Sequence, residues 1–319
     1  MRHRSSVAAP LETRGDQHLH EALNAHSGTY TKVGGFVASA RSQYQTLQIV
    51  DTPQFGRVLR LDGYTMTSEF DEFHYHENLV HVAAVSHTEP ARVLIVGGGD
   101  GGAAREVLRH RCVARVDVVE LDAMVVKFAK TYLPTVHGDA FSNPRLKLHI
   151  GDGKHWLENT STTYDLIILD LTDPLGHAHA LYTVEFYRTC RSRLNPGGIL
   201  ALHVESPIAR PNTCHRIVKT LEAAFPRVRP YLVFVPTYGT VLAMATASLD
   251  VDPARLPADE VESRLASRGI SGLQYYNGAM HCAAFALPNY LRERLAGEAE
   301  IVSEHGNRLD GNDELPLET

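Results

Sequence analysis

Four acidic residues each follow one of the apolar segments in the middle of the chain. They are Asp100, Glu120, Asp152 and Asp170. Any one of them alone is well explained as a solvated loop carboxylate or a helix cap. However, the ligands of an open parallel sheet bind outside the carboxyl ends of its strands. Four acids at successive strand ends therefore predict one acidic rim that binds a cationic ligand.

The last of these acids has a partner three residues further on. Asp170 and Asp173 are followed by Pro174 and Gly176, residue types that favour a tight loop. Two carboxylates facing one cavity can bind a cationic amine and accept its proton as the nitrogen becomes a nucleophile. The alternative is structural: Asp173 begins an Asp-Pro turn and Asp170 caps a strand.

A glycine-rich turn precedes the acids and indicates a nucleoside ligand. The apolar run 93–96 leads into GGGDGG at 97–102, which fits G-x-G-x-x-G, although such turns also occur for packing alone. Asp100 would repel the phosphates of a dinucleotide, so a nucleoside with neutral or cationic groups fits better. Glu120 stands about 20 positions beyond Gly99, a spacing typical of an acid that binds ribose hydroxyls. Asp152, next to Gly153, is placed to accept from an adenine amino group.

The elements that position these residues alternate between strands and helices, which predicts a parallel, doubly wound sheet. Upstream, two runs with β character and turn signals predict a small antiparallel N-terminal domain, followed by a helix over 69–85. The expected strands of the large sheet are 93–96, 115–120, 146–150, 164–170, 199–204, 231–235 and 240–245, and the expected helices are 122–133, 154–159, 184–193 and 215–224.

The composition restricts the class of protein. The chain has 319 residues, 44% of them hydrophobic and 21% charged, with a net charge of −6. The charge, without any Lys/Arg cluster, argues against nucleic acid or an anionic membrane as partner. With no apolar run of about 20 residues and no signal peptide, we expect a cytoplasmic protein. The four cysteines are far apart and predict neither a disulfide framework nor a zinc site.

Aromatic and histidine residues complete the candidate site. Tyr75 and Tyr238, with Tyr275 or Tyr276, could line an apolar channel for methylene groups, although half-buried tyrosines more often serve packing. Several histidines occur at H-x-H spacing, including those at 74–76 and 177–179. Without a third ligand we expect no metal.

These motifs together resemble the polyamine aminopropyltransferases of the spermidine synthase family. The resemblance covers about residues 30–295. The segments that carry it are YQ at 44–45, LDG at 61–63, DEFHYHE at 71–77, GGGDGG at 97–102, VELD at 119–122, GDG at 151–153, DLTDP at 170–174, PTY at 236–238 and YYN at 275–277. Methyltransferases share the glycine turn and the ribose acid, but the segments at 71–77 and 170–174 are specific to this family.

The resemblance implies a role for each candidate residue. Decarboxylated S-adenosylmethionine would be held by Gln45, His76, Asp100, Glu120, Asp152 and Gly153, with Asp173 on its amino group. Asp170 would be the proton acceptor. The acceptor amine would contact Tyr75, Asp170, Asp173, His203, Glu205 and Tyr238. No cofactor is implied, because the sulfonium donor is a co-substrate.

The implied fold is α/β: a Rossmann-like, doubly wound, mostly parallel sheet like that of the S-adenosylmethionine-dependent methyltransferases, with a small N-terminal antiparallel β domain. We expect a flexible arm at 1–27, the β domain and its linking helix at 28–86, the catalytic domain at 87–297 and a disordered acidic tail at 298–319. The resemblance also implies a homodimer or homotetramer.

Departures from the family pattern leave the acceptor open. Leu171 replaces a serine common in spermidine synthases, the loop around His177 differs, and His203 stands where animal members have glutamine. Putrescine is the first expectation, with cadaverine, agmatine and spermidine as alternatives. A methyltransferase using intact S-adenosylmethionine and a non-catalytic polyamine- or nucleoside-binding module are the competing hypotheses.

Overall fold

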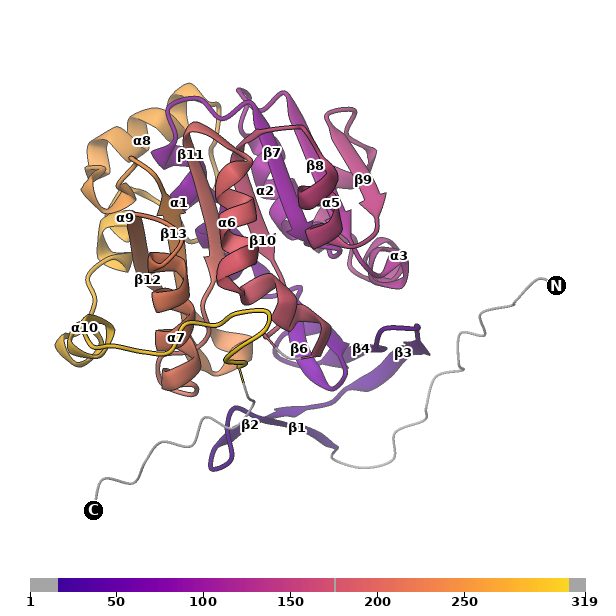
Figure 1. Ribbon diagram of the computed structural model, residues 1–319. Helices are drawn as coiled ribbons and strands as arrows, with labels where there is room; N and C mark the ends of the chain where they lie inside the picture. Colours follow the sequence, from indigo (N-terminus) through magenta and orange to yellow (C-terminus); the bar gives the residue numbers. More distant parts are fainter. Residues whose placement is uncertain (1–16, 175, 310–319) are drawn as a thin grey trace, which may run out of the picture.

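The structure is a computed structural model that describes residues 17–174 and 176–309. Its N-terminal part consists of two small antiparallel sheets (Figure 1). One is a hairpin, and the other has the strand order β3-β4-β5-β6. The strands are β1 (His18–Ala22), β2 (Gly28–Lys32), β3 (Gly35–Arg41), β4 (Thr46–Thr52), β5 (Gly56–Leu61) and β6 (Tyr64–Ser68).

The hairpin corrects one sequence-based expectation. We expected a flexible arm up to residue 27, but β1 pairs with β2 along its whole length. Glu21 also accepts hydrogen bonds from the backbone N–H and the hydroxyl of Thr65, at 3.0 and 2.7 Å. Backbone pairing and one acidic side chain stabilise β1 in place of an apolar face, so the sequence gave no hydrophobic alternation to detect. Residues 1–16 of the expected arm lie outside the described part.

Helix α1 (Glu72–Ser86) connects the small sheets to the large one and is buried along almost its entire length. Its buried residues include polar ones such as His76, Glu77 and Asn78, each at most 2% exposed. A helix that is buried on all sides needs partners for such groups, and Glu77 accepts from the backbone N–H groups of residues 274–276. The helix therefore fixes the DEFHYHE segment rigidly beside the large sheet.

The large sheet has seven strands in the order β12-β13-β11-β10-β7-β8-β9. Six of them run in the same direction, and β13 runs antiparallel to its two neighbours. The strand order reverses between β7 and β10, which makes this pair the switch point of the sheet. The bounds are β7 (Arg92–Gly97), β8 (Arg115–Glu120), β9 (Leu146–Ile150), β10 (Tyr164–Asp170), β11 (Leu194–His203), β12 (Arg227–Val235) and β13 (Thr240–Ser248).

Helices cover both faces of this sheet, and each face has its own apolar cluster (Figure 1). One cluster includes residues of α1, α2, α8 and α9, and the other includes residues of α5, α6 and α7. The helices are α2 (Gly102–Arg109), α3 (Ala123–Tyr132), α4 (Pro134–His137), α5 (Gly153–Asn159), α6 (Val184–Ser192), α7 (Pro211–Glu222), α8 (Ala258–Ser267), α9 (Gly278–Ala284) and α10 (Asn289–Ala296), with 3-10 turns η1 (Ala140–Ser142), η2 (Gly176–Tyr182), η3 (Pro236–Tyr238) and η4 (Pro253–Arg255). The expected fold, a mostly parallel doubly wound sheet with a small N-terminal β domain, is confirmed. No helix among the described residues is both long and apolar enough to cross a bilayer.

The segment after α10 differs from the disordered tail that we expected. Val302 is fully buried and Leu309 is 8% exposed, and both belong to the apolar cluster under α6 and α7. Val302 also accepts a hydrogen bond from the Val184 N–H and donates one to the Thr220 hydroxyl, both at 2.9 Å. Isolated apolar residues in an acidic segment carry no periodicity, so the sequence alone did not reveal this packing. Residues 310–319 lie outside the described part.

The packing of the tail can be tested with two neighbouring residues. Val302→Ala should lower the free energy of unfolding by about 2 kcal/mol, because two buried methyl groups are lost and a cavity remains. Ile301, which is 40% exposed, is the control, and Ile301→Ala should change the stability by less than about 0.5 kcal/mol. Urea denaturation measures both variants. Equal effects would show that the tail does not pack in solution.

Candidate active site

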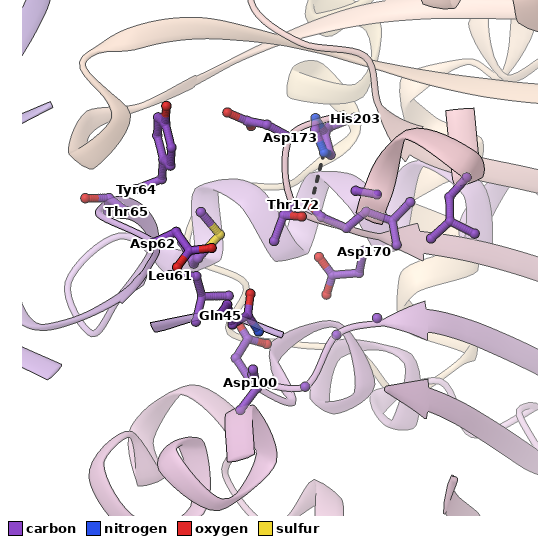
Figure 2. Close-up of a pocket in the computed structure, with 18 of the residues that line it drawn as sticks. Gln45, Leu61, Asp62, Tyr64, Thr65, Asp100, Asp170, Thr172, Asp173 and His203 are labelled. Carbon is purple, nitrogen blue, oxygen red and sulfur yellow. Dashed lines mark hydrogen bonds between the residues drawn. The ribbon is translucent and has the colours of Figure 1, made fainter. Parts of the chain in front are cut away.

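A cavity of about 840 Å³ lies at the switch point, between the carboxyl ends of the large sheet and the small N-terminal sheets. Figure 2 shows Asp62, Tyr64 and Thr65 on the N-terminal side of this cavity and Asp170 and Asp173 across from them. Twelve of the sequence-predicted residues line it: Gln45, Tyr75, His76, Asp100, Glu120, Asp152, Gly153, Asp170, Asp173, His203, Glu205 and Tyr238. The volume is within the usual range for small-molecule sites.

Two glycines allow the ends of β7 and β10 to touch. Gly97 has φ +79°, and a Cβ there would lie 2.1 Å from the carbonyl oxygen of Asp170. The Gly98 N–H donates to that same oxygen at 2.9 Å. Because only glycine tolerates this contact, the loop brings the backbone directly against the acid at the end of β10.

Glu120 is held at the end of β8 by two backbone donors. Its carboxylate accepts from the N–H of Gly99 at 3.1 Å and from the N–H of Asp122 at 2.8 Å. Burial is the main cause that raises the pKa of Glu120 to about 7, and the nearby Asp122 carboxylate adds to the rise. The Glu120 carboxylate is thus fixed in orientation at the wall of the cavity, where it can accept hydrogen bonds from the hydroxyl groups of a ligand.

Asp152 and Asp100, two further acids of the cavity wall, differ in their surroundings. Asp152 is exposed and caps α5, accepting from the N–H groups of Lys154 and His155 at 2.8 and 3.3 Å. Asp100 accepts from the Gly102 N–H at 2.9 Å and lies 3.4 Å from His76 Nε2. Asp152 therefore combines the structural role of a cap with a place in the cavity wall.

His76 is part of a row of alternating charges. Its Nδ1 lies 2.7 Å from Glu72, which in turn binds Arg105 at 2.8 Å. Burial opposes the charged imidazole, but Asp100 and Glu72 outweigh it and raise the pKa of His76 well above its usual value. Burial also opposes the charge of Asp100, yet His76 and the Gly102 N–H lower the pKa of Asp100. At neutral pH this pair is ionised.

Asp170 differs from Asp100 because few neighbouring groups stabilise its negative charge. Its Oδ2 is buried and has no hydrogen-bond partner among the described residues. Burial, and next the negative charge of Asp100, raise the pKa of Asp170 to about 7, although His76 and a hydrogen bond from Tyr75 act in the opposite direction. A carboxyl group whose pKa is near 7, and whose Oδ2 has no hydrogen-bond partner among the described residues, is suited to accept a proton.

The opposite wall of the cavity is aromatic. The Tyr238 hydroxyl donates to the Met66 carbonyl at 2.6 Å, which ties this wall to the N-terminal sheet. The Tyr75 ring lies 6.3 Å from the Tyr238 ring and 6.4 Å from the His203 ring, between centroids. These rings form the apolar surface that the sequence suggested for methylene groups. Tyr275 and Tyr276 do not line the cavity.

His203 and Leu171, two residues that depart from the family pattern, contact each other. His203 Nε2 lies 3.1 Å from the Leu171 carbonyl oxygen and 2.8 Å from the Tyr182 hydroxyl. The Tyr182 hydroxyl donates to the Thr172 carbonyl at 3.0 Å, so Nε2 carries the proton of the ring. Burial lowers the pKa of His203, which keeps the ring neutral. His203 therefore positions the loop that carries Asp173.

Sequence reasoning missed two residues that shape the site. Asp122 accepts from the Gln45 amide at 3.1 Å and from the Ser42 hydroxyl at 2.6 Å, and so orients Gln45. Its place in the VELD motif was the available signal. Arg210 lines the cavity beside Asp173 and Glu205, at 3.6 and 3.5 Å. No motif pointed to Arg210.

The fold and the acidic cavity at its switch point define a nucleoside-binding α/β protein of the methyltransferase-like type. The chain matches two family models: the spermine/spermidine synthase domain over residues 72–250 and the spermidine synthase tetramerisation domain over residues 20–69. The first match alone covers more than half of the chain. The protein therefore belongs to the spermine/spermidine synthase family, and the sequence-based resemblance is confirmed.

Individual relatives agree with this assignment. The polyamine aminopropyltransferase of Nitrosomonas europaea is 46% identical over 290 residues, covering 91% of this chain and 89% of that protein. The polyamine aminopropyltransferase of Klebsiella pneumoniae is 39% identical, covering 87% and 97%. Two solved spermidine synthase structures are each 34% identical. One is a complex with the transition-state analogue AdoDATO; it has a TM-score of 0.83, and the match covers 91% of this chain and 98% of that chain. The other is from Thermotoga maritima; it has a TM-score of 0.82, and the match covers 91% of this chain and 97% of that chain.

The raised pKa of Asp170 predicts that neutralising two acids on β10 has opposite effects on stability. Because folding raises the pKa of Asp170 from 3.8 to about 7, its contribution to stability is fully present below about pH 4 and is lost as the pH rises through 7. Asp170→Asn should therefore raise the Tm relative to the parent more at pH 8 than at pH 5.

Asp165, at the other end of β10, is the matched control. It accepts from the N–H groups of Ala91 and Arg92, and although burial opposes its charge, these bonds and one from Asn195 lower its pKa. Its contribution is present above about pH 4, so Asp165→Asn should lower the Tm at both pH 5 and pH 8. Thermal unfolding at the two pH values measures both variants, and a Tm gain for Asp170→Asn that does not grow with pH would contradict the raised pKa.

Proposed function

We propose that this protein transfers the aminopropyl group of decarboxylated S-adenosylmethionine to putrescine, releasing spermidine and methylthioadenosine. The amine nitrogen attacks the methylene carbon next to the sulfonium, and the C–S bond breaks with its electron pair passing to sulfur. The N–H proton that is then lost goes to Asp170. The observation that carries this proposal is Asp170 itself, a half-buried residue in the cavity wall whose Oδ2 atom is buried and has no hydrogen-bond partner among the described residues.

The donor half of the cavity supports the proposal. Glu120, fixed by two backbone donors, would accept from the ribose hydroxyls, and Asp152 with Gly153 would meet the adenine. Gln45, His76 and Asp100 would contact the part of the donor that carries the sulfonium, and the resemblance assigns Asp173 to its amino group. Acidic side chains predominate here, which suits a donor with positive charge and no carboxylate.

The part of the cavity that would bind the acceptor must accept a proton from an amine that is protonated at neutral pH. Such amines have pKa values of about 10, so proton transfer to a carboxylate of ordinary pKa would be uphill by about 6 pKa units. With a pKa of about 7, Asp170 halves that difference, to about 3 units or roughly 4 kcal/mol. The apolar surroundings that raise this pKa therefore also make Asp170 a better base. Tyr75 and Tyr238 would orient the methylenes, while His203 and Glu205 lie toward the far end.

We further propose that the reaction uses no metal or prosthetic group. His76, Asp100 and Asp170 do place ligand-type atoms within 4.8 Å of one another. However, the raised pKa of His76 keeps its imidazole protonated, without a lone pair for a metal. The sulfonium already provides the leaving group, so no Lewis acid is required.

The N-terminal sheets correspond to the family's tetramerisation domain, and we propose that they join copies of this chain into a homodimer or homotetramer. We also propose a cytoplasmic location. The negative net charge supports the further proposal that nucleic acid and anionic membranes are not partners. Sedimentation of the purified protein measures the assembly.

A donor and acceptor panel tests the activity directly. The purified protein, with and without EDTA, is given decarboxylated or intact S-adenosylmethionine and putrescine, cadaverine, agmatine or spermidine. We expect methylthioadenosine only from the decarboxylated donor, fastest with putrescine and unaffected by EDTA, because Asp173 and Glu205 would repel the carboxylate of the intact donor. S-adenosylhomocysteine from the intact donor would instead identify a methyltransferase, and no turnover from either donor would favour a non-catalytic binding module.

The role of Asp170 is tested by Asp170→Asn. Loss of a general base should lower kcat by about 10²- to 10⁴-fold, while the Kd of methylthioadenosine changes little. Asp165→Asn, on the same strand but away from the cavity, serves as the control and should keep kcat within about 2-fold of the parent. Steady-state kinetics and a binding titration give both quantities. An unchanged kcat in Asp170→Asn would show that another group takes the proton.

A further inference from the structure

We propose that Arg210 determines which amines are accepted, by closing the far end of the acceptor half of the cavity against a third ammonium group. The inference rests on the proposed aminopropyl transfer. It assigns to this chain a preference for diamines over triamines, set by one cationic side chain that no motif identified.

Arg210 lies between two carboxylates that the resemblance assigns to the acceptor amine, Asp173 and Glu205. Its Nη1 is 3.6 Å from Asp173 Oδ2 and 3.5 Å from Glu205 Oε1. Arg210 is 11% exposed and Glu205 is 6% exposed, so the contact is formed largely inside the protein. One guanidinium nitrogen thus lies between two carboxylates that would otherwise both be available to the amino groups of substrates.

The backbone turn after β11 brings Glu205 and Arg210 close to each other. Glu205 follows β11 with φ +71°, a left-handed conformation that is uncommon for a residue other than glycine. The turn continues with Ser206, whose hydroxyl accepts from the N–H groups of Ile208 and Ala209 at 3.3 and 3.0 Å. The strand therefore ends in a tight turn that places the Glu205 carboxylate and Arg210 on the same side of the cavity.

The N-terminal hairpin fixes Arg210 from the other side. Arg210 Nε donates to the Leu23 carbonyl at 3.2 Å, and the Asn24 amide donates to the Ala209 carbonyl at 3.1 Å. Leu23 also lines the cavity. Arg210 is thus held between the hairpin loop and the turn after β11, which distinguishes it from a mobile surface arginine.

The balance of charge explains the selectivity. The resemblance assigns Asp173 to the donor's amino group, which leaves Glu205 as the carboxylate for one distal ammonium group of the acceptor, with the Arg210 guanidinium directly beside it. Putrescine brings a single ammonium beyond its attacking nitrogen. A triamine such as spermidine brings a further cation to the guanidinium, and like charges in close contact are strongly unfavourable. Arg210 therefore disfavours longer, more highly charged acceptors.

Substitution of Arg210 tests this inference. In Arg210→Ala, the ratio of kcat/KM for spermidine to kcat/KM for putrescine should rise by about 10-fold or more, because the repelling charge is gone. Arg210→Met keeps most of the side-chain length, and we expect a similar rise because charge carries the exclusion. Arg210→Lys keeps the charge and should stay within about 3-fold of the parent ratio. Arg188→Ala, an exposed arginine of α6 outside the cavity, is the control and should leave the ratio unchanged.

A binding measurement separates this inference from the proposed reaction. Titration of putrescine and spermidine into protein saturated with methylthioadenosine gives the two Kd values without turnover, and thermal unfolding shows that each variant is folded. The parent should bind putrescine more tightly, and Arg210→Ala should lose that preference. An unchanged Kd ratio and an unchanged kcat/KM ratio in folded Arg210→Ala would overturn the role of Arg210. Absence of turnover in the parent would overturn only the proposed reaction, since the titration still reports the preference.

Discussion

The contact between the carboxyl ends of β7 and β10 is the constraint on which the site depends. Gly97 pairs with Asp170 in the sheet, and the Gly98 N–H donates to the Asp170 carbonyl. Since a Cβ at Gly97 would lie 2.1 Å from that oxygen, the contact requires glycine. It fixes Asp170 at the switch point, where burial raises its pKa to about 7. The position of the proposed base in the cavity wall therefore follows from this one close approach.

The acids of the cavity fall into two groups, and their environments explain the division. Asp100 is paired with a protonated His76 and remains ionised, so it presents a carboxylate at the cavity wall as one half of an ion pair. Glu120 and Asp170 lack such a cation in direct contact, and burial brings both pKa values to about 7. Similar residue types thus perform different tasks, because the surrounding groups, rather than the side chains themselves, set their protonation.

Much of the fold could be predicted because hydrophobic periodicity is a local property. Strands β8, β9 and β10 begin and end where the sequence predicted, and the alternation of strands and helices gave the parallel sheet. The strand at His18–Ala22 and the buried tail around Val302 were missed. In both places backbone hydrogen bonds or single apolar residues provide the stability, and neither leaves a periodic pattern. Their partners, β2 and α7, become visible only once the chain is folded.

The sequence by itself determined which residues line the site. The glycine turn, the acids that follow the strands, the DEFHYHE segment and the resemblance to the spermidine synthase family selected twelve residues, and all twelve lie around one cavity. Tertiary structure decided what each of them contacts: Gln45 binds Asp122, His203 binds the Leu171 carbonyl, and Arg210 lies between Asp173 and Glu205. The reason is physical. Residue type and strand ends are encoded locally, whereas pairing, burial and therefore pKa depend on distances between segments that are remote in sequence.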